Sequence, residues 1–198
     1  MNILLDTLPE TIVVDGEEFF ADTDFRTMII FEKIITDETI DPRSRVDMLV
    51  DLVLTASQPA EKASAMDGII YLYSCGEPPE GKIEAQRNGK VVIRPKMIYS
   101  YEHDAPYIYG AFMSQYGIDL NSVEYLHWWK FQALFRSLNS ENKIVEIMGY
   151  RAADLSKIKN DEERQRIQRL QQIYALPQTY TYEEKVAMAG AAFAGGFR

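Results

Sequence analysis

The chain is short of cysteine and histidine, and this shortage excludes several kinds of site. Cys75 is its only cysteine. It can form neither an internal disulfide nor a multi-cysteine zinc site, and we interpret it as a small apolar residue at a helix end in a protein of the reducing cytoplasm. The only histidines are His103 and His127. With no third histidine and no His-Glu-x-x-His spacing, the sequence predicts no zinc site.

Catalytic and phosphate-binding motifs are missing as well. The stretch GEPPEGK at 76–82 lacks the Gly-Lys-Ser/Thr ending of a phosphate-binding loop, and neither Gly-x-Gly-x-x-Gly nor Gly-x-Ser-x-Gly occurs. His103 beside Asp104 is compatible with an acid–base pair, and the Asp-Thr-Asp at 22–24 with a metal-binding pair. Helix capping explains these aspartates more simply. We therefore predict no enzymatic activity, no cofactor and no metal.

Long apolar runs and excess positive charge are also absent. No uncharged apolar run approaches the ~20 residues that span a bilayer, and the start, MNILLDTLPE, has no basic region typical of a secretory signal. Residues 1–75 hold 5 Lys/Arg and 15 Asp/Glu, a balance of −10, whereas the rest hold 16 and 15. We therefore expect neither a membrane nor a nucleic acid as partner. The acidic part is either a solvated surface that aids solubility or a face for a basic partner segment.

What is present suits a globular, mainly α-helical domain, because 46% of the 198 residues are hydrophobic. Asp15-Gly16 lies between two β-branched and aromatic runs, which predicts a hairpin with strands near 10–14 and 17–21. Periodicity and capping residues predict helices over most of the remaining chain. In the first half of the chain, one predicted helix runs from Asp22 or Asp24 to about Ile35, a second begins at Asp41-Pro42, and a third ends at Gly76 as a left-handed cap. Two more follow, one from about 105 to 116 after Asp104 and one that begins at the capping box Asn121–Glu124. The last three are predicted over 140–150, from Asn160 towards Pro177, and from the capping box Thr181–Glu184.

The predicted organisation is a single compact domain of about seven or eight helices at 1–177, with the N-terminal hairpin at 10–21. Residues 77–98 are rich in proline and glycine, so we predict a mobile insert there, with RNGK at 87–90 as the turn of a second small hairpin. Residues 178–198 are predicted to form a C-terminal helical or apolar tail.

The stretch EYLHWWKF at 124–131 concentrates the aromatic residues. On a helix, Trp128 and Trp129 would share one side with Tyr125 and Phe135, while His127, Phe131, Leu134 and Leu138 would share another. A helix that is apolar nearly all round is usually buried, so we interpret it as the central helix of the core. The alternative is a groove that receives a partner helix, with Trp128 and Trp129 as its anchors.

Two other apolar surfaces are candidate contacts for a partner. The helix predicted at 160–175 carries a narrow stripe formed by Ile167, Leu170 and Tyr174. The tail at 186–197 is apolar and includes Phe193 and Phe197. The alternative for the tail is a frayed chain end.

Five segments of the chain resemble one protein family. They are LPETIVVDGEEFFADTDFRTMIIFE at 8–32, YEHDAPYIYGAFMSQYGIDL at 101–120, EYLHWWKFQALFRSL at 124–138, IMGYRAADLSKIK at 147–159 and YALP at 174–177. In this order and spacing they resemble the bacteriophage gene-product-fifteen family of long-tailed phages and prophages of Gram-positive bacteria. The resemblance covers most of residues 3–177. The family is not defined by a catalytic activity, and the resemblance carries no active-site residues to this chain.

The resemblance implies a role in tail assembly. Genes of this family usually lie between those of the major tail protein and the tape measure protein, the position of tail assembly chaperones in other long-tailed phages. We therefore expect a chaperone that binds the tape measure protein and keeps it soluble in the cytoplasm of the infected or lysogenic host. Self-association and a frameshifted longer form are further partners that the resemblance implies. The alternative is a structural subunit of the tail or tail tip that stays in the virion.

Overall fold

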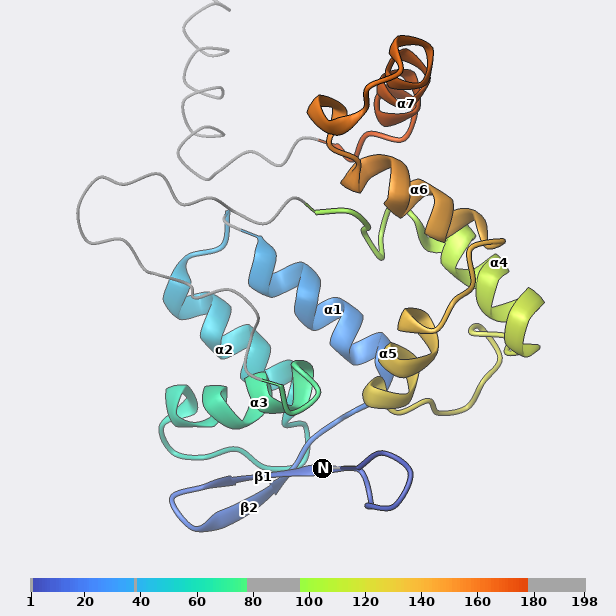
Figure 1. Ribbon diagram of the computed structural model, residues 1–198. Coiled ribbons are helices and arrows are strands. Elements are labelled where there is room, and N and C mark those ends of the chain that lie inside the picture. The colour runs from blue at the N-terminus through green and yellow to red at the C-terminus, as the bar shows by residue number, and fades with distance from the viewer. Residues whose placement is uncertain (1, 38, 78–96, 178–198) are drawn as a thin grey trace, which may run out of the picture. The chain divides into compact units, whose positions relative to one another are not determined.

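The computed structural model describes residues 2–37, 39–77 and 97–177 (Figure 1). Over these residues the chain is mainly α-helical, with seven α-helices, two short 3-10 helices and one N-terminal two-stranded sheet, which confirms the predicted fold class. The described residues divide into two compact units. Unit 1 comprises the chain up to Glu77 together with residues 125–131, and unit 2 comprises residues 97–124 and 132–177.

The N-terminal hairpin of unit 1 forms where the sequence predicts it. Strand β1 (Thr11–Val14) pairs antiparallel with β2 (Glu17–Phe20). The turn residues Asp15 and Gly16 have φ values of 51° and 84°, the backbone that an Asp-Gly hairpin turn requires. One face of the hairpin is buried, because Ile12, Val14 and Phe19 all point into unit 1.

Three α-helices complete unit 1: α1 (Phe25–Thr36), α2 (Pro42–Val53) and α3 (Met66–Tyr73), the last preceded by the 3-10 helix η1 (Lys62–Ala65). Of the two predicted caps for α1, the structure selects Asp24, whose side chain accepts from the Arg26 N–H. Asp41 caps α2 with proline at the first helical position, as predicted. The core of these helices is formed by Met28, Phe31, Leu49, Val50, Val53, Leu54, Ile69 and Leu72.

The C-terminal end of α3 has a left-handed backbone, as Gly76 predicts. Two consecutive residues have positive φ, Cys75 at 59° and Gly76 at 74°, and the Gly76 N–H donates to the Tyr71 carbonyl at 2.9 Å. This bond closes the last turn of the helix. Cys75 is therefore a half-buried residue directly after a helix end.

Unit 2 contains α4 (Ala105–Tyr116), α6 (Lys143–Ala152) and α7 (Asp161–Ile173), with the 3-10 helix η2 (Leu155–Lys157) between the last two. The bounds of α4 agree with the prediction, and Gly117 ends it with φ 65°. Asn160 caps α7 by accepting from the Glu163 N–H at 2.9 Å, again as predicted. The core of unit 2 includes Ile108, Phe112, Phe135, Ile144 and Ile147.

Asp104 precedes α4, but the prediction that its side chain caps this helix is wrong. The structure gives Asp104 no side-chain capping bond. Its carboxylate is instead buried and paired with the guanidinium of Arg151, at 2.6 and 2.9 Å. The guanidinium of Arg151 in α6 replaces the N–H groups of the first turn of α4 as partner, because a bidentate ion pair makes two charge-assisted hydrogen bonds where a cap makes one.

The predicted capping box at Asn121 and Glu124 is also wrong, because helix α5 (Trp128–Arg136) begins later. Residues 120–122 form a turn instead, and the Asp119 side chain accepts from the Asn121 N–H at 2.9 Å. The backbone near His127 pairs with Asp24 as an isolated antiparallel bridge. This pairing uses backbone groups that an earlier start of the helix would need.

Two predicted features lie outside the described residues. They are most of the insert at 77–98, including its second hairpin, and the helix with the capping box at Thr181 and Glu184.

Candidate functional site

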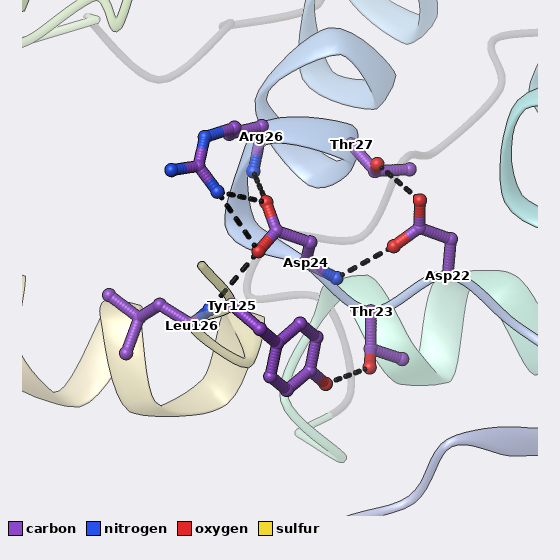
Figure 2. Close-up of polar contacts among 7 residues, drawn as sticks. All are labelled: Asp22, Thr23, Asp24, Arg26, Thr27, Tyr125 and Leu126. Atoms are coloured by element: carbon purple, nitrogen blue, oxygen red, sulfur yellow. Dashed lines mark hydrogen bonds and ion pairs between the residues drawn. The ribbon is translucent and has the colours of Figure 1, made fainter. Parts of the chain in front are cut away.

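The aromatic segment 125–131 of unit 1 lies beside the Asp-Thr-Asp stretch at 22–24 (Figure 2). The Trp128 N–H donates to the Thr23 carbonyl at 2.7 Å, and the Phe25 N–H donates to the Leu126 carbonyl at 3.0 Å. The Leu126 N–H donates to the Asp24 carboxylate at 3.1 Å. Segments about 100 residues apart in sequence are thus joined by backbone hydrogen bonds just where α1 and α5 begin.

Both aspartates of this stretch are occupied by hydrogen bonds within unit 1. Asp22 accepts from the Asp24 N–H at 3.0 Å and from the Thr27 hydroxyl at 2.8 Å. Asp24 accepts from the Arg26 N–H at 3.0 Å and also pairs with the Arg26 guanidinium at 3.1 Å. The interpretation of Asp24 as a helix cap is confirmed. Within the described ranges, no group of three or more His, Cys, Asp or Glu side chains could hold a metal ion.

Tyr125 is the exposed aromatic residue of the segment. Its hydroxyl and that of Thr23 are 2.7 Å apart (Figure 2), while 47% of the residue remains exposed. The pKa of Tyr125 is raised, mainly because the side chain is partly buried. The predicted position of Tyr125 on a helix, beside the tryptophans, is wrong because Tyr125 precedes α5.

His127 is buried as a neutral ring. Its Nδ1 accepts from the Trp129 N–H at 3.0 Å, so the proton must lie on Nε2, which faces the Pro9 carbonyl at 3.1 Å. Burial lowers the pKa of His127, partly offset by the Pro9 carbonyl. The ring therefore fastens the chain before β1 to the start of α5.

The second histidine does not form an acid–base pair with its neighbour. His103 is exposed, whereas the Asp104 carboxylate is buried against Arg151. The Asp104 carboxylate is occupied by Arg151, so it serves neither as the predicted cap of α4 nor as the partner of His103.

Trp128 and Trp129 lie in the core of unit 1, with 1% and 6% of each residue exposed. The indole N–H of Trp128 donates to the Tyr73 carbonyl, and that of Trp129 donates to the Leu72 carbonyl, each at 2.7 Å. These carbonyls belong to the last turn of α3, where backbone acceptors lack partners within the helix. The two tryptophans thus cap the C-terminal end of α3.

The rings of this region form a continuous series of aromatic contacts. Phe25 stacks on Phe131 at 4.9 Å between centroids, Phe131 on Trp128 at 5.6 Å, and Trp128 on Tyr73 at 5.7 Å. Tyr73 contacts Phe31 of α1 at 4.9 Å. The interpretation of this segment as core is confirmed for the two tryptophans and Phe131. A role of the tryptophans in partner binding stays a prediction, and neither ring is exposed in this structure.

The stripe on α7 is partly used within unit 2. Ile167 is buried, whereas Leu170 and Tyr174 are half-buried, and the Tyr174 ring stacks on Tyr150 of α6 at 6.1 Å. Partner binding through these residues stays a prediction. Phe193 and Phe197 lie outside the described residues.

Sequence reasoning missed the exposed face of the hairpin. Val13 and Phe20 are 68% and 67% exposed. The sequence does contain a signal for this face: each strand carries two consecutive apolar residues, Val13-Val14 and Phe19-Phe20. Because side chains alternate between the two faces of a strand, one residue of each pair must point outward. Two upstream residues, Leu4 and Leu5, are also exposed.

Comparison with protein-family models places these features in a known family. A model described as Bacteriophage Gp15 protein matches residues 4–176. The match covers most of the chain, so the chain belongs to the bacteriophage Gp15 family. It is therefore a bacteriophage protein, and the family indicates a structural or assembly role. Neither the curated proteins nor the solved structures give a match. In the described part of the chain, no helix has the length and apolar character that crossing a membrane requires.

Proposed function

We propose that the chain is a tail assembly chaperone of a long-tailed phage. It binds the tape measure protein and keeps that protein soluble in the host cytoplasm until the tail tube forms around it. The observation that carries the proposal is the family match over residues 4–176, joined to the gene order that the resemblance implies. The longer frameshifted form and self-association are parts of the same proposal.

The physical properties of the described residues are compatible with this role. A tape measure protein is a long helical polymer, so a chaperone must cover many similar apolar stretches and then leave. Small exposed apolar surfaces suit such binding, because each contact is weak and the total affinity comes from repetition. Val13 and Phe20 on the hairpin are exposed apolar residues of this kind.

We also propose that the chain has no catalytic activity. Three of the acidic and imidazole groups have a structural partner: Asp24 caps α1, Asp104 pairs with Arg151, and His127 bonds to Trp129 and Pro9. These groups fix the backbone rather than face a substrate.

Co-expression with the neighbouring tape measure protein tests the proposal. The chain is purified through an affinity tag, and the eluted complex is weighed by light scattering. We expect many copies of this chain on one soluble tape measure chain. A tape measure protein that stays insoluble while this chain elutes alone would contradict the proposal and favour a structural subunit of the tail or tail tip.

A further inference from the structure

The outer face of the N-terminal hairpin has a defined composition. In the strand register, Thr11 is opposite Phe20 and Val13 is opposite Glu18, so these four side chains share one face of the sheet. Val13 and Phe20 are diagonal neighbours on that face, at a separation of roughly 7–8 Å, within reach of an aromatic side chain. The two most exposed apolar residues of the hairpin thus form one small patch.

This apolar patch is exposed although the fold buries other apolar residues of the same strands. Ile12, Val14 and Phe19 face unit 1 and are at most 6% exposed, whereas Val13 and Phe20 remain more than 65% exposed. β1 and β2 are rigidly held, because Ile12 packs against α3 at Gly68 and the chain before β1 is bonded to His127. The patch is therefore presented on a fixed support.

The hairpin and the chain on either side of it carry only negative charge. Residues 2–25 contain seven acidic residues and no lysine or arginine. Glu10, Asp15, Glu17 and Glu18 are all exposed, and in the described part of the chain none of them forms an ion pair. The Glu18 carboxylate accepts from the Thr11 hydroxyl at 2.7 Å, which holds one negative charge on the same face as Val13 and Phe20.

We propose that this hairpin face, formed by Val13, Phe20 and the surrounding carboxylates, is the surface that binds the tape measure protein. This inference rests on the proposed function. The bound segment of the tape measure protein is amphipathic: its apolar side chains cover Val13 and Phe20, and its lysine or arginine side chains pair with the carboxylates. Complementary charge directs such a segment to this face and fixes its orientation.

Charge also distinguishes this occupant from a second copy of the same chain. Two copies that met through their hairpins would bring together two acidic segments that lack lysine and arginine, and like charges across an interface disfavour association. A segment with basic side chains relieves this repulsion.

The experiment compares variants for binding to the co-expressed tape measure protein. In Val13→Thr/Phe20→Thr the patch becomes polar while both residues keep a high preference for strands. Ile173→Ser is the matched control, because Ile173 is equally exposed (67%) but lies on α7 in unit 2. We expect the hairpin variant to weaken binding by at least about tenfold, as loss of an apolar anchor does, and the control to bind normally. Circular dichroism and melting curves confirm that each variant is folded.

A second variant tests the charges. Glu18→Gln removes the carboxylate on the same face as Val13 and Phe20 without changing side-chain size, and it keeps an acceptor for the Thr11 hydroxyl. We expect weaker binding at low salt and a smaller loss of affinity as salt is raised, because fewer attractive charges remain to be screened.

The outcomes separate this inference from the proposed function. If the wild-type chain does not bind the tape measure protein, the proposed function fails and this inference fails with it. If the wild type binds and the folded hairpin variants bind equally well, only the hairpin inference is overturned. A wild-type dimer that the Val13→Thr/Phe20→Thr variant converts to a monomer would also overturn it, because the occupant would then be a second copy.

Discussion

At the scale of single residues, two tryptophans explain why the aromatic segment is core rather than pocket. The rings of Trp128 and Trp129 are buried, and their indole N–H groups donate hydrogen bonds to carbonyls of the last turn of α3. Phenylalanine could supply a ring in either place but not the hydrogen bond. The apolar ring of each tryptophan is therefore buried within unit 1, and its polar N–H is hydrogen-bonded there.

The tryptophans give a prediction about stability. Trp129→Ala is expected to lower the free energy of unfolding by roughly 3–5 kcal/mol, because a large buried ring is removed. Trp128→Phe keeps most of the ring and should lose about 1–3 kcal/mol, because the hydrogen bond from the indole N–H to the Tyr73 carbonyl is removed. Denaturant unfolding measures both. A Trp129→Ala protein with unchanged stability and lost partner binding would contradict the core assignment.

His127 gives a prediction about pH. Because burial lowers its pKa in the folded protein below the ordinary value of 6.5, the unfolded chain binds more protons near that value. The stability that His127 contributes is therefore fully present above pH 6.5 and is lost as the pH falls below it. Protonation of Nδ1 would also remove the acceptor for the Trp129 N–H.

Melting temperatures of the wild type and of His127→Gln at about pH 7.5 and about pH 5.5 measure this effect. We expect the wild type to lose more stability than the variant between the two values, since the variant lacks the titrating ring. Comparing the two proteins removes the contribution of Glu32, whose raised pKa, caused mainly by burial, acts in the opposite direction. Equal losses in the two proteins would show that His127 does not couple to folding.

At the scale of elements, the buried ion pair of unit 2 connects several segments. Arg151 of α6 pairs with Asp104 at the start of α4 and also donates to the carbonyls of Ile98, at 3.0 Å, and Tyr174, at 2.6 Å. The Ser100 N–H donates to the same Asp104 carboxylate at 2.9 Å. One guanidinium thus fixes the chain before α4 and the chain after α7.

Removal of Arg151 should therefore be costly. Arg151→Met leaves the Asp104 carboxylate buried without its partner, and we expect a loss of about 3–5 kcal/mol in the free energy of unfolding. The double variant Asp104→Asn/Arg151→Met should lose less than the single variant, because no unpaired charge remains buried. Urea unfolding of both proteins provides the comparison, and an equal or larger loss in the double variant would contradict this account of the pair.

Close packing between α3 and the hairpin gives a further prediction. A Cβ added at Gly68 would lie 2.8 Å from the Ile12 Cβ, whereas one added at Gly110 in α4 would meet nothing within 4 Å. We expect Gly68→Ala to destabilise the protein by about 1–3 kcal/mol through overpacking. Gly110→Ala, the matched control, should stabilise it by about 0.5–1 kcal/mol, because alanine loses less conformational freedom in a helix. Thermal melts that move in the same direction for both variants would refute the close approach.

The helix predictions succeeded or failed according to the range of the interactions involved. The bounds of α4 were predictable because local residues set them: Pro106 in its first turn and Gly117 at its end. The start of α5 was not predictable, since residues near 24 take up the backbone at 126–128. A capping box at Asn121 is a local signal and carries no information about a partner 100 residues away. The role of Asp104 was missed for the same reason, because Arg151 is 47 residues further along.

At the scale of the whole molecule, the chain order does not follow the compact units. Residues 125–131 belong to unit 1, although the residues on both sides of them belong to unit 2. The hydrophobic pattern predicted a buried helix at this place but could not indicate which part of the chain would bury it. The acidic character of the N-terminal part, in contrast, could be predicted from the sequence, and the structure shows an exposed apolar patch on this part.

The proposed chaperone role is tested most directly by counting this protein in finished particles. Quantitative mass spectrometry of purified mature phage would measure its copies relative to the tape measure protein, with an assembling lysate as the reference. A chaperone that leaves before the tail is complete predicts a strong signal in the lysate and less than about one copy per tape measure chain in the particle, since binding that is reversible need not persist. A fixed number of copies in every mature particle would contradict the account and identify the protein as a structural part of the tail.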